Sequence, residues 1–323
     1  MRLQIRDAHP VTRARVAVAS AISEVACRIK EHGDAGQWGR ELEDLVRGAS
    51  GGMLIGIPLL YTMEVWWIGS STAPSRMAAV LLFSFVPVFF LMRVSGFRQS
   101  KDARVVDAVV DSVDALALGI VCVTAVLILL REVTLTTPLA EVVGKVVYEA
   151  LPFAIGVALA RHFLQRSRNA GDDEGEDGDS TTAEATAART GLHSTIADIG
   201  ATVIGAVFVA FNIAPTDEIP MLAAASSPTW LLAMVAASLL VSYCIVFEAG
   251  FASQAKRRQQ RGVLQRPLTE TAVCYLVSLL AAAFMLWLFQ NLDLGSPWTM
   301  SLQHIVLLGL PACVGGAAGR LAT

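Results

Sequence analysis

The sequence predicts an all-α fold: a polytopic transmembrane helix bundle of eight spans, arranged as two parallel four-helix repeats. Composition is the first observation, because 54% of the 323 residues are hydrophobic and only 16% are charged. Mean hydropathy is +0.56, which is too apolar for an ordinary soluble domain of this size. Apolar runs near the roughly 20 residues that a helix needs to cross a bilayer recur along the chain. Finally, uncommon residues repeat in the same order in the two halves.

The apolar runs predict eight spans. They lie at about 50–69, 77–95, 112–130, 140–160, 196–214, 229–247, 270–290 and 302–319. The chain then has four parts: basic amphipathic cytoplasmic helices (residues 1–48), a first transmembrane repeat (49–165), an acidic disordered cytoplasmic linker (166–195) and a second transmembrane repeat (196–323).

Before the first span, Val18 and Ile22 begin an apolar stripe at helical spacing among basic residues. The stripe is consistent with helices that dock on the bundle and also with an interfacial helix that grips anionic lipid. No hydrophobic signal peptide precedes it, so we expect the first span to act as the insertion signal. The linker contains GDDEGEDGDSTTAEATAART, which is too acidic and too poor in apolar residues to fold alone.

Lys and Arg are concentrated before the first span, after the second, in the linker and after the sixth. On the other side of the predicted bundle only Arg76, Arg131 and Lys145 occur. Because cytoplasmic segments keep positive charge, both termini are predicted to be cytoplasmic, in a bacterial inner membrane. Trp66, Trp67, Trp230 and Trp298 near the outer ends fit an interfacial aromatic belt.

The internal repeat is carried by two motifs. A Thr-x-Glu element, with a proline ten residues after its Glu, recurs 154 positions later, and a Leu-Pro-x3-Gly-x4-Arg element recurs 159 positions later. The pairs are Thr62/Thr216, Glu64/Glu218, Pro74/Pro228, Pro152/Pro311, Gly156/Gly315 and Arg161/Arg320. Upstream, Ile55-Gly56 matches Ile204-Gly205 at 149, which predicts five inserted residues in the second copy. In the Leu-Pro-x3-Gly-x4-Arg motif the glycine is predicted to allow close helix approach and the arginine to extend to the cytoplasmic headgroups. Four spans per copy give both copies the same topology, related by an axis along the membrane normal.

Glu64 and Glu218 are the main candidates for an ion or proton site, since ionisable groups at membrane depth need a partner, water or a purpose. Pro215 frees backbone carbonyls beside Glu218. Two carboxylates with nearby hydroxyls suit a hard cation or a shared proton. The alternative is that they cap helix ends at the outer water interface. The supporting residues are Asn212, Thr62, Thr216 and Asp217.

Two further groups are secondary candidates. Asp107, Asp111 and Asp114 share one helical face, and Asp114 is matched by Glu270. They predict either an acidic vestibule or ion pairs with residues such as Arg161 and Arg320. Lys145 is matched by His304, and Glu149 follows Lys145 by one turn. The second group predicts a Lys145/Glu149 salt bridge or a proton relay in which His304 titrates.

Several classes of function are not indicated. The chain has no P-loop, GxSxG, HExxH or GxGxxG motif, so no enzyme of a soluble type is predicted. The basic clusters lack interleaved aromatic residues, which argues against nucleic acid. Five cysteines are scattered singly, so we predict buried thiols with no disulfide, metal or other cofactor.

The stretches ELEDLVRGASGGMLIGIPLLYTMEVWWIG, FNIAPTDEIPML and LPACVGGAAGR resemble a family of uncharacterised bacterial integral membrane proteins. The resemblance covers nearly all of the chain from Glu41, apart from the linker, and implies the eight-span topology but no activity. From the residues, the expected function is a transporter or channel for a small cation or protons that uses paired carboxylates. The alternative is a non-transporting membrane scaffold or sensor. The expected partners are the lipid bilayer and a small cation or proton.

Overall fold

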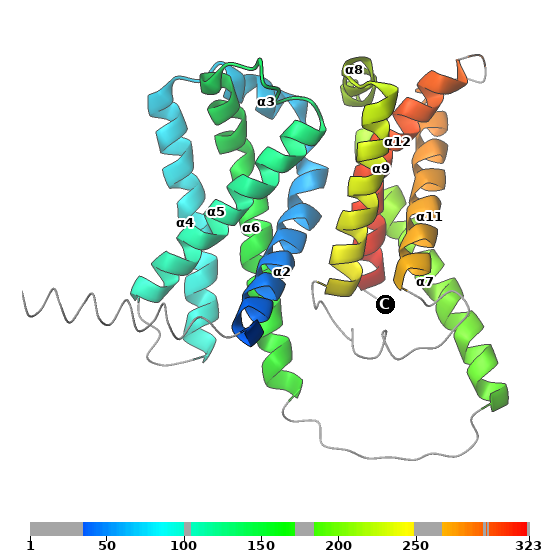
Figure 1. Cartoon of the computed structure of the whole chain (residues 1–323), viewed down its shortest axis with the longest axis horizontal. Helices are drawn as coiled ribbons and strands as arrows, with labels where there is room; N and C mark the ends of the chain where they lie inside the picture. The colour runs from blue at the N-terminus through cyan, green and yellow to red at the C-terminus, as the bar shows by residue number, and fades with distance from the viewer. Residues whose placement is uncertain are drawn as a thin grey trace, which may run out of the picture. The chain divides into compact units, whose positions relative to one another are not determined.

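The computed structural model describes residues 35–99, 105–171, 184–248, 267–292, 295 and 297–321, and every element in those ranges is a helix (Figure 1). The chain divides into two units, residues 1–44 and 45–323, and the description below concerns the second. Its helices follow one another in the order long, short, long, long, long, and this order occurs twice.

The first series begins with α2, which runs on from the first unit. Its members are α2 (Ala35–Leu60), α3 (Met63–Ser70), α4 (Pro74–Gln99), α5 (Val105–Leu129) and α6 (Leu139–Gly171). The second series has one π-helical turn after its third member. It comprises α7 (Glu184–Ile213), α8 (Glu218–Ala225), α9 (Pro228–Tyr243) with the π turn η1 (Cys244–Glu248), α11 (Pro267–Leu288) and α12 (Trp298–Leu321).

Six of the described helices are long and apolar enough to cross a membrane alone, namely α4, α5, α6, α9 with its π turn, α11 and α12. The helix pairs α2/α3 and α7/α8 pass the same test only together, because they bend by 89° and 87°. The apolar run at 50–69, predicted as one continuous span, is therefore broken at Tyr61 and Thr62. Thr62 has an extended backbone (φ −99°, ψ 93°), which interrupts the helical hydrogen bonds there.

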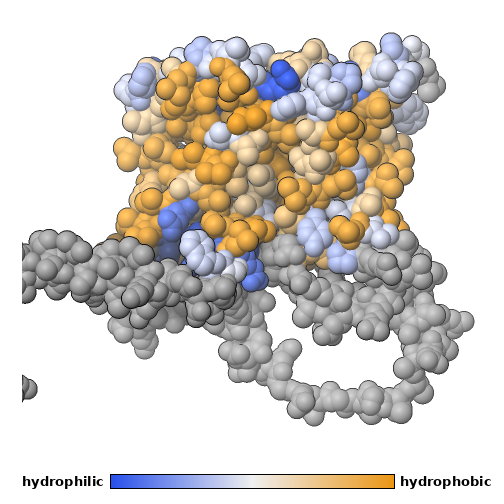
Figure 2. All heavy atoms as spheres, in the orientation of Figure 1, coloured by the Kyte–Doolittle hydropathy of each residue, from blue (hydrophilic) through white to orange (hydrophobic). Residues whose placement is uncertain are grey.

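The surface of the described region agrees with a membrane environment. Apolar residues form a belt across the face seen in Figure 2, and polar residues gather at its upper and lower margins. Large apolar side chains are exposed within the spans, including Leu82 (71%), Phe208 (73%) and Leu280 (71%). Water would not favour such exposure over several helices, whereas lipid would.

Two pairs of glycines let helices approach to backbone contact. A Cβ added to Gly51 on α2 would collide with the backbone of Gly156 on α6, and one added to Gly205 on α7 would collide with Gly315 on α12. Lipid does not drive apolar helices together, so close van der Waals contact of this kind is a main source of bundle stability. The glycine of each Leu-Pro-x3-Gly-x4-Arg motif thus has the packing role predicted for it.

The helix boundaries differ from several sequence predictions. Residues 35–48 continue into α2, and α6 and α7 extend into the predicted linker at 166–171 and 184–195. The Ala-rich segment EATAART has high helix propensity, which explains the extension of α7. Predicted surface helices before residue 35 and the linker centre at 172–183 lie outside the described residues. Trp66 is not part of an aromatic belt: it is fully buried, and its Nε1 donates to the Leu60 carbonyl at 2.7 Å.

A buried hydrogen bond joins the two series of helices. The Tyr61 hydroxyl donates to the Leu307 carbonyl of α12 at 2.8 Å. Pro311 lies four residues after Leu307 and has no backbone N–H, so this carbonyl lacks its usual intrahelical donor. The proline of the second Leu-Pro motif therefore provides the acceptor that Tyr61 uses.

Tyr61→Phe should lower the free energy of unfolding by about 1 kcal/mol, because it leaves the Leu307 carbonyl buried without a donor. Unfolding by a denaturing detergent measures the loss. In a Pro311→Ala background the restored backbone N–H can serve the Leu307 carbonyl, and the loss should be smaller. An equal loss in both backgrounds would show that the proline is irrelevant to this bond.

Candidate functional site

The two carboxylates of the main predicted site occupy corresponding positions with different surroundings. Glu64 lies in the first turn of α3 and Glu218 in the first turn of α8. Glu64 is exposed, whereas Glu218 is only 5% exposed. A carboxylate in the first turn is favoured by the free N–H groups and dipole of the helix. That is sufficient for Glu64, which fits the helix-capping interpretation.

The residues predicted to support this pair do not converge on it. Asn212 Nδ2 donates to the Phe208 carbonyl at 2.8 Å, and Thr216 Oγ1 donates to the Ile213 carbonyl at 2.6 Å. Thr62 and Asp217 are exposed. The side chains of Asn212 and Thr216 therefore bond the end of their own helix. Among the described residues no group of three or more His, Cys, Asp or Glu could hold a metal ion.

Glu218 differs from its counterpart in one chemical respect. Its Oε2 atom is buried and has no hydrogen-bond partner. Leaving a buried acceptor unsatisfied costs about 1–3 kcal/mol, and more when the group is charged. The carboxyl group at the start of α8 is thus held in surroundings that a simple helix cap does not require.

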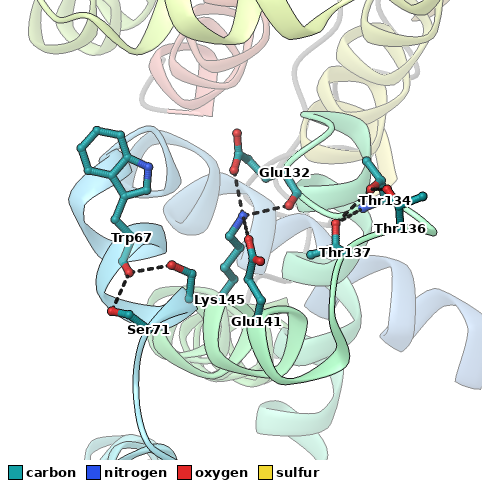
Figure 3. A network of polar contacts seen from close by, with 9 residues as sticks. Trp67, Ser71, Glu132, Thr134, Thr136, Thr137, Glu141 and Lys145 are labelled. Carbon is teal, nitrogen blue, oxygen red and sulfur yellow. Dashed lines mark hydrogen bonds and ion pairs between the residues drawn. The ribbon is translucent and has the colours of Figure 1, made fainter.

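The predicted Lys145/Glu149 salt bridge is wrong. Lys145 Nζ lies 2.9 Å from Glu141 Oε1 and 3.1 Å from Glu132 Oε2, and it also donates to the Glu132 backbone carbonyl at 3.0 Å (Figure 3). The side chain reaches toward the loop between α5 and α6 because a carboxylate and a carbonyl meet there. A Glu four residues before a Lys is also the better helical orientation for an ion pair.

Glu149 is consequently a second buried carboxyl group. Its side chain is 2% exposed, and its Oε1 accepts no hydrogen bond. It lies on α6 inside a helix that is long and apolar enough to span a membrane. An ionisable group in such a place is a functional candidate by default. Sequence analysis included Glu149 but assigned it the wrong partner.

His304, the counterpart of Lys145, is buried on α12 at 4% exposure. Lys145 forms two ion pairs, with Glu132 and Glu141, and donates to the Glu132 carbonyl; none of these contacts involves His304. The two matched positions hold different chemical groups: a cation neutralised by two carboxylates in α6, and an imidazole in α12.

An ionic cluster lies at the C-terminal end of α12. Arg320 is 2% exposed and forms ion pairs with Glu270 on α11 and, at 3.7 Å, with Asp198 on α7. This confirms the ion-pair interpretation for Glu270 and Arg320. Arg320 is buried among helices, although the motif predicted that it would extend to lipid headgroups. Sequence analysis missed Asp198, which the spacing of 154 from Asp44 could have indicated.

The acidic face on α5 does not form a corresponding buried cluster. Asp111 and Asp114 are both exposed, and the side chain of Asp107 lies outside the described residues. Arg161, the counterpart of Arg320, is half-buried. The Asp114/Arg161 positions of the first series therefore match Glu270/Arg320 of the second in sequence but differ from them in burial.

Comparison with known proteins gives one family. A family model described as "Putative integral membrane protein (DUF2391)" matches residues 44–323. No curated protein and no solved structure matches the chain.

Proposed function

The chain belongs to this family of integral membrane proteins, and from that premise we propose that it moves protons across the bilayer, with Glu218 and Glu149 as the proton-carrying groups. One observation carries the proposal. Each of these two carboxyl groups is at most 5% exposed and has a buried oxygen without a hydrogen-bond partner.

These carboxyl groups differ from two buried cations, Lys145 and Arg320. Lys145 faces two carboxylates, and Arg320 faces Glu270 and Asp198, so both cations are neutralised in place. Such pairs hold helices together and leave no group ready to exchange a proton. An isolated carboxylate in apolar surroundings is costly, and uptake of a proton removes that cost. A group that gains by binding a proton and can release it to water suits proton transfer.

Protons fit this site better than a metal ion. A hard cation needs six or more oxygen ligands, or water in their place. The side chains predicted to supply them, Asn212 and Thr216, bond their own helix, and Asp217 is exposed. A proton needs only one carboxylate oxygen and a neighbouring donor or acceptor.

The same proposal includes eight spans in two parallel repeats, with both termini in the cytoplasm of a bacterium. It is supported by the repeated order of helices and by the bends of 89° and 87° after the first helix of each series. The glycine contacts also correspond, because Gly51 meets Gly156 as Gly205 meets Gly315. These contacts align Gly51 with Gly205, 154 positions later, which is the offset of the Thr-x-Glu element. The offset of 149 and the five-residue insertion inferred from it are therefore not needed.

Proton flux into liposomes that contain the purified protein and a pH-sensitive dye tests the proposal. Glu218→Gln and Glu149→Gln should each lower the flux by about tenfold or more, because an amide of the same shape cannot carry a proton. Glu64→Gln is the matched control, since it changes the exposed counterpart of Glu218 and should leave the flux near that of the wild type.

Two results would contradict it. Wild-type protein that moves protons no faster than empty liposomes removes the function and favours the non-transporting scaffold or sensor. A Glu149→Gln/Glu218→Gln double variant that folds and conducts as the wild type does would separate the function from these residues. Elution volume and unfolding midpoint in detergent check that each variant is folded.

A further inference from the structure

The interior of the second series of helices contains a set of small polar side chains that neither the sequence motifs nor the proposed carriers include. We call it the hydroxyl–thiol cluster. Each member is at most 5% exposed, and together they come from α9, α11 and α12. Its members are Ser238, Ser242, Cys274, Tyr275, Ser278 and Cys313.

Four members are linked by contacts that run from helix to helix. Ser242 Oγ donates to Cys274 Sγ at 3.8 Å, and Cys313 Sγ donates to the Ser238 carbonyl at 3.7 Å. Polar groups therefore adjoin one another through the centre of three packed helices.

The two remaining members of the cluster are Tyr275 and Ser278. The Tyr275 hydroxyl and the Ser278 Oγ are buried and have no hydrogen-bond partner. A hydroxyl in a helix interior usually bonds a carbonyl of the preceding turn, as Ser238 Oγ does with the Met234 carbonyl at 2.8 Å. Ser278 does not do so, and Tyr275 is too long to do so. Each of these unpaired hydroxyls is suited to bind a small hydrogen-bonding molecule, and water is the smallest one with both donor and acceptor capacity.

Helix α12 presents glycines to these hydroxyls. A Cβ added to Gly316 would lie 2.6 Å from Ser278 Oγ, and a Cβ added to Gly309 would lie 4.0 Å from the Tyr275 hydroxyl oxygen. The Ser278 oxygen thus packs closely against Gly316, and a side chain at Gly316 would displace it.

The corresponding interior of the first series is apolar. The residues 156 positions before Cys274, Tyr275 and Ser278 are Leu118, Gly119 and Cys122. Cys122 belongs to a cluster of buried apolar side chains, and a Cβ on Gly119 would meet the α6 backbone at Ala154. Only Ser84, the counterpart of Ser238, retains a hydroxyl, and it is bonded to the Val80 carbonyl at 2.8 Å. Apart from Ser84, the hydroxyls of the cluster therefore have no hydroxyl counterpart in the first series.

We propose that the hydroxyl–thiol cluster binds water and forms the part of the proton route that crosses the second series of helices. On α11 the cluster follows Glu270 of the ionic cluster, and Ser278 is about 12 Å farther along the helix at ~1.5 Å per residue. The cluster lies between that ionic end and the end of the bundle where α11 terminates. This inference rests on the proposed function.

Reaction of the native thiols with 2-hydroxyethyl methanethiosulfonate, a small neutral reagent, tests for water without reference to transport. In full-length protein in liposomes, Cys274 or Cys313 should react about tenfold faster than Cys122, although all three are buried. Peptide mass spectrometry identifies the modified residue. Ser278→Cys gives a matched comparison, because it introduces a thiol at the position that corresponds to Cys122.

Equal or slower labelling of Cys274, Cys313 and Ser278→Cys relative to Cys122 would overturn the proposal, whatever the liposomes conduct. Tyr275→Phe/Ser278→Ala should lower proton flux by about tenfold, and the control Ser84→Ala should not. If the thiols label quickly while this double variant conducts normally and Glu218→Gln does not, the route through the cluster is wrong and the proposed function stands. If no variant or wild type conducts, the proposed function fails instead.

Discussion

Gly205→Leu is expected to lower the free energy of unfolding by about 3 kcal/mol or more and to reduce the yield of folded protein. A Cβ at this position collides with the Gly315 backbone carbonyl, and its next neighbour is the Gly319 nitrogen. Backbone atoms of two long helices cannot give way locally, so α7 and α12 must separate. Lipid solvates the separated helices as well as it solvates the bundle, and no hydrophobic force opposes the separation.

Gly200→Leu is the matched control for this prediction. Gly200 lies on the same helix, and a Cβ there meets nothing within 4 Å. Both substitutions replace glycine by a better helix former, which contributes a gain of about 1 kcal/mol in each case. The difference between their unfolding midpoints in detergent therefore reports the α7/α12 contact. Equal stabilities for the two variants would contradict the close approach of these helices.

The second large effect is expected at the ionic cluster. Arg320→Leu should lower the free energy of unfolding by about 3–5 kcal/mol, since it leaves the carboxylates of Glu270 and Asp198 without this shared cation. Detergent-induced unfolding followed by circular dichroism measures the loss. The loss of stability is expected because two partly buried carboxylates without the Arg320 cation carry both a solvation cost and mutual repulsion.

Two variants make that prediction specific. Arg161→Leu changes the half-buried counterpart and should have a smaller effect. Arg320→Leu/Glu270→Leu removes the nearer carboxylate together with the cation and should be more stable than Arg320→Leu alone. If the double variant is instead less stable by the sum of the two single losses, the pair is not coupled as the structure implies.

Prediction from sequence succeeded where one residue type carries one physical property. The glycines of the Leu-Pro-x3-Gly-x4-Arg motif lie where helices touch, because only glycine permits backbone contact. It also succeeded for Glu270 and Arg320, where opposite charges were expected at one end of the bundle. It was wrong for Lys145, which was paired with Glu149 one turn later but contacts Glu141 one turn earlier and Glu132 in the preceding loop. Helical spacing gives the intrahelical partners of a side chain but not those on another segment.

The sequence by itself determined that the chain is an integral membrane protein of apolar helices, because length and hydropathy depend on composition within each segment. It also located the glycines and charges that matter. Only the tertiary structure decided which charged groups are buried. Glu64 and Glu218 share a motif, but Glu64 is exposed and Glu218 is buried. It likewise decided that Tyr275 and Ser278 lie unpaired in one half. Burial and hydrogen bonding depend on what the other helices place beside a residue, which local sequence does not contain.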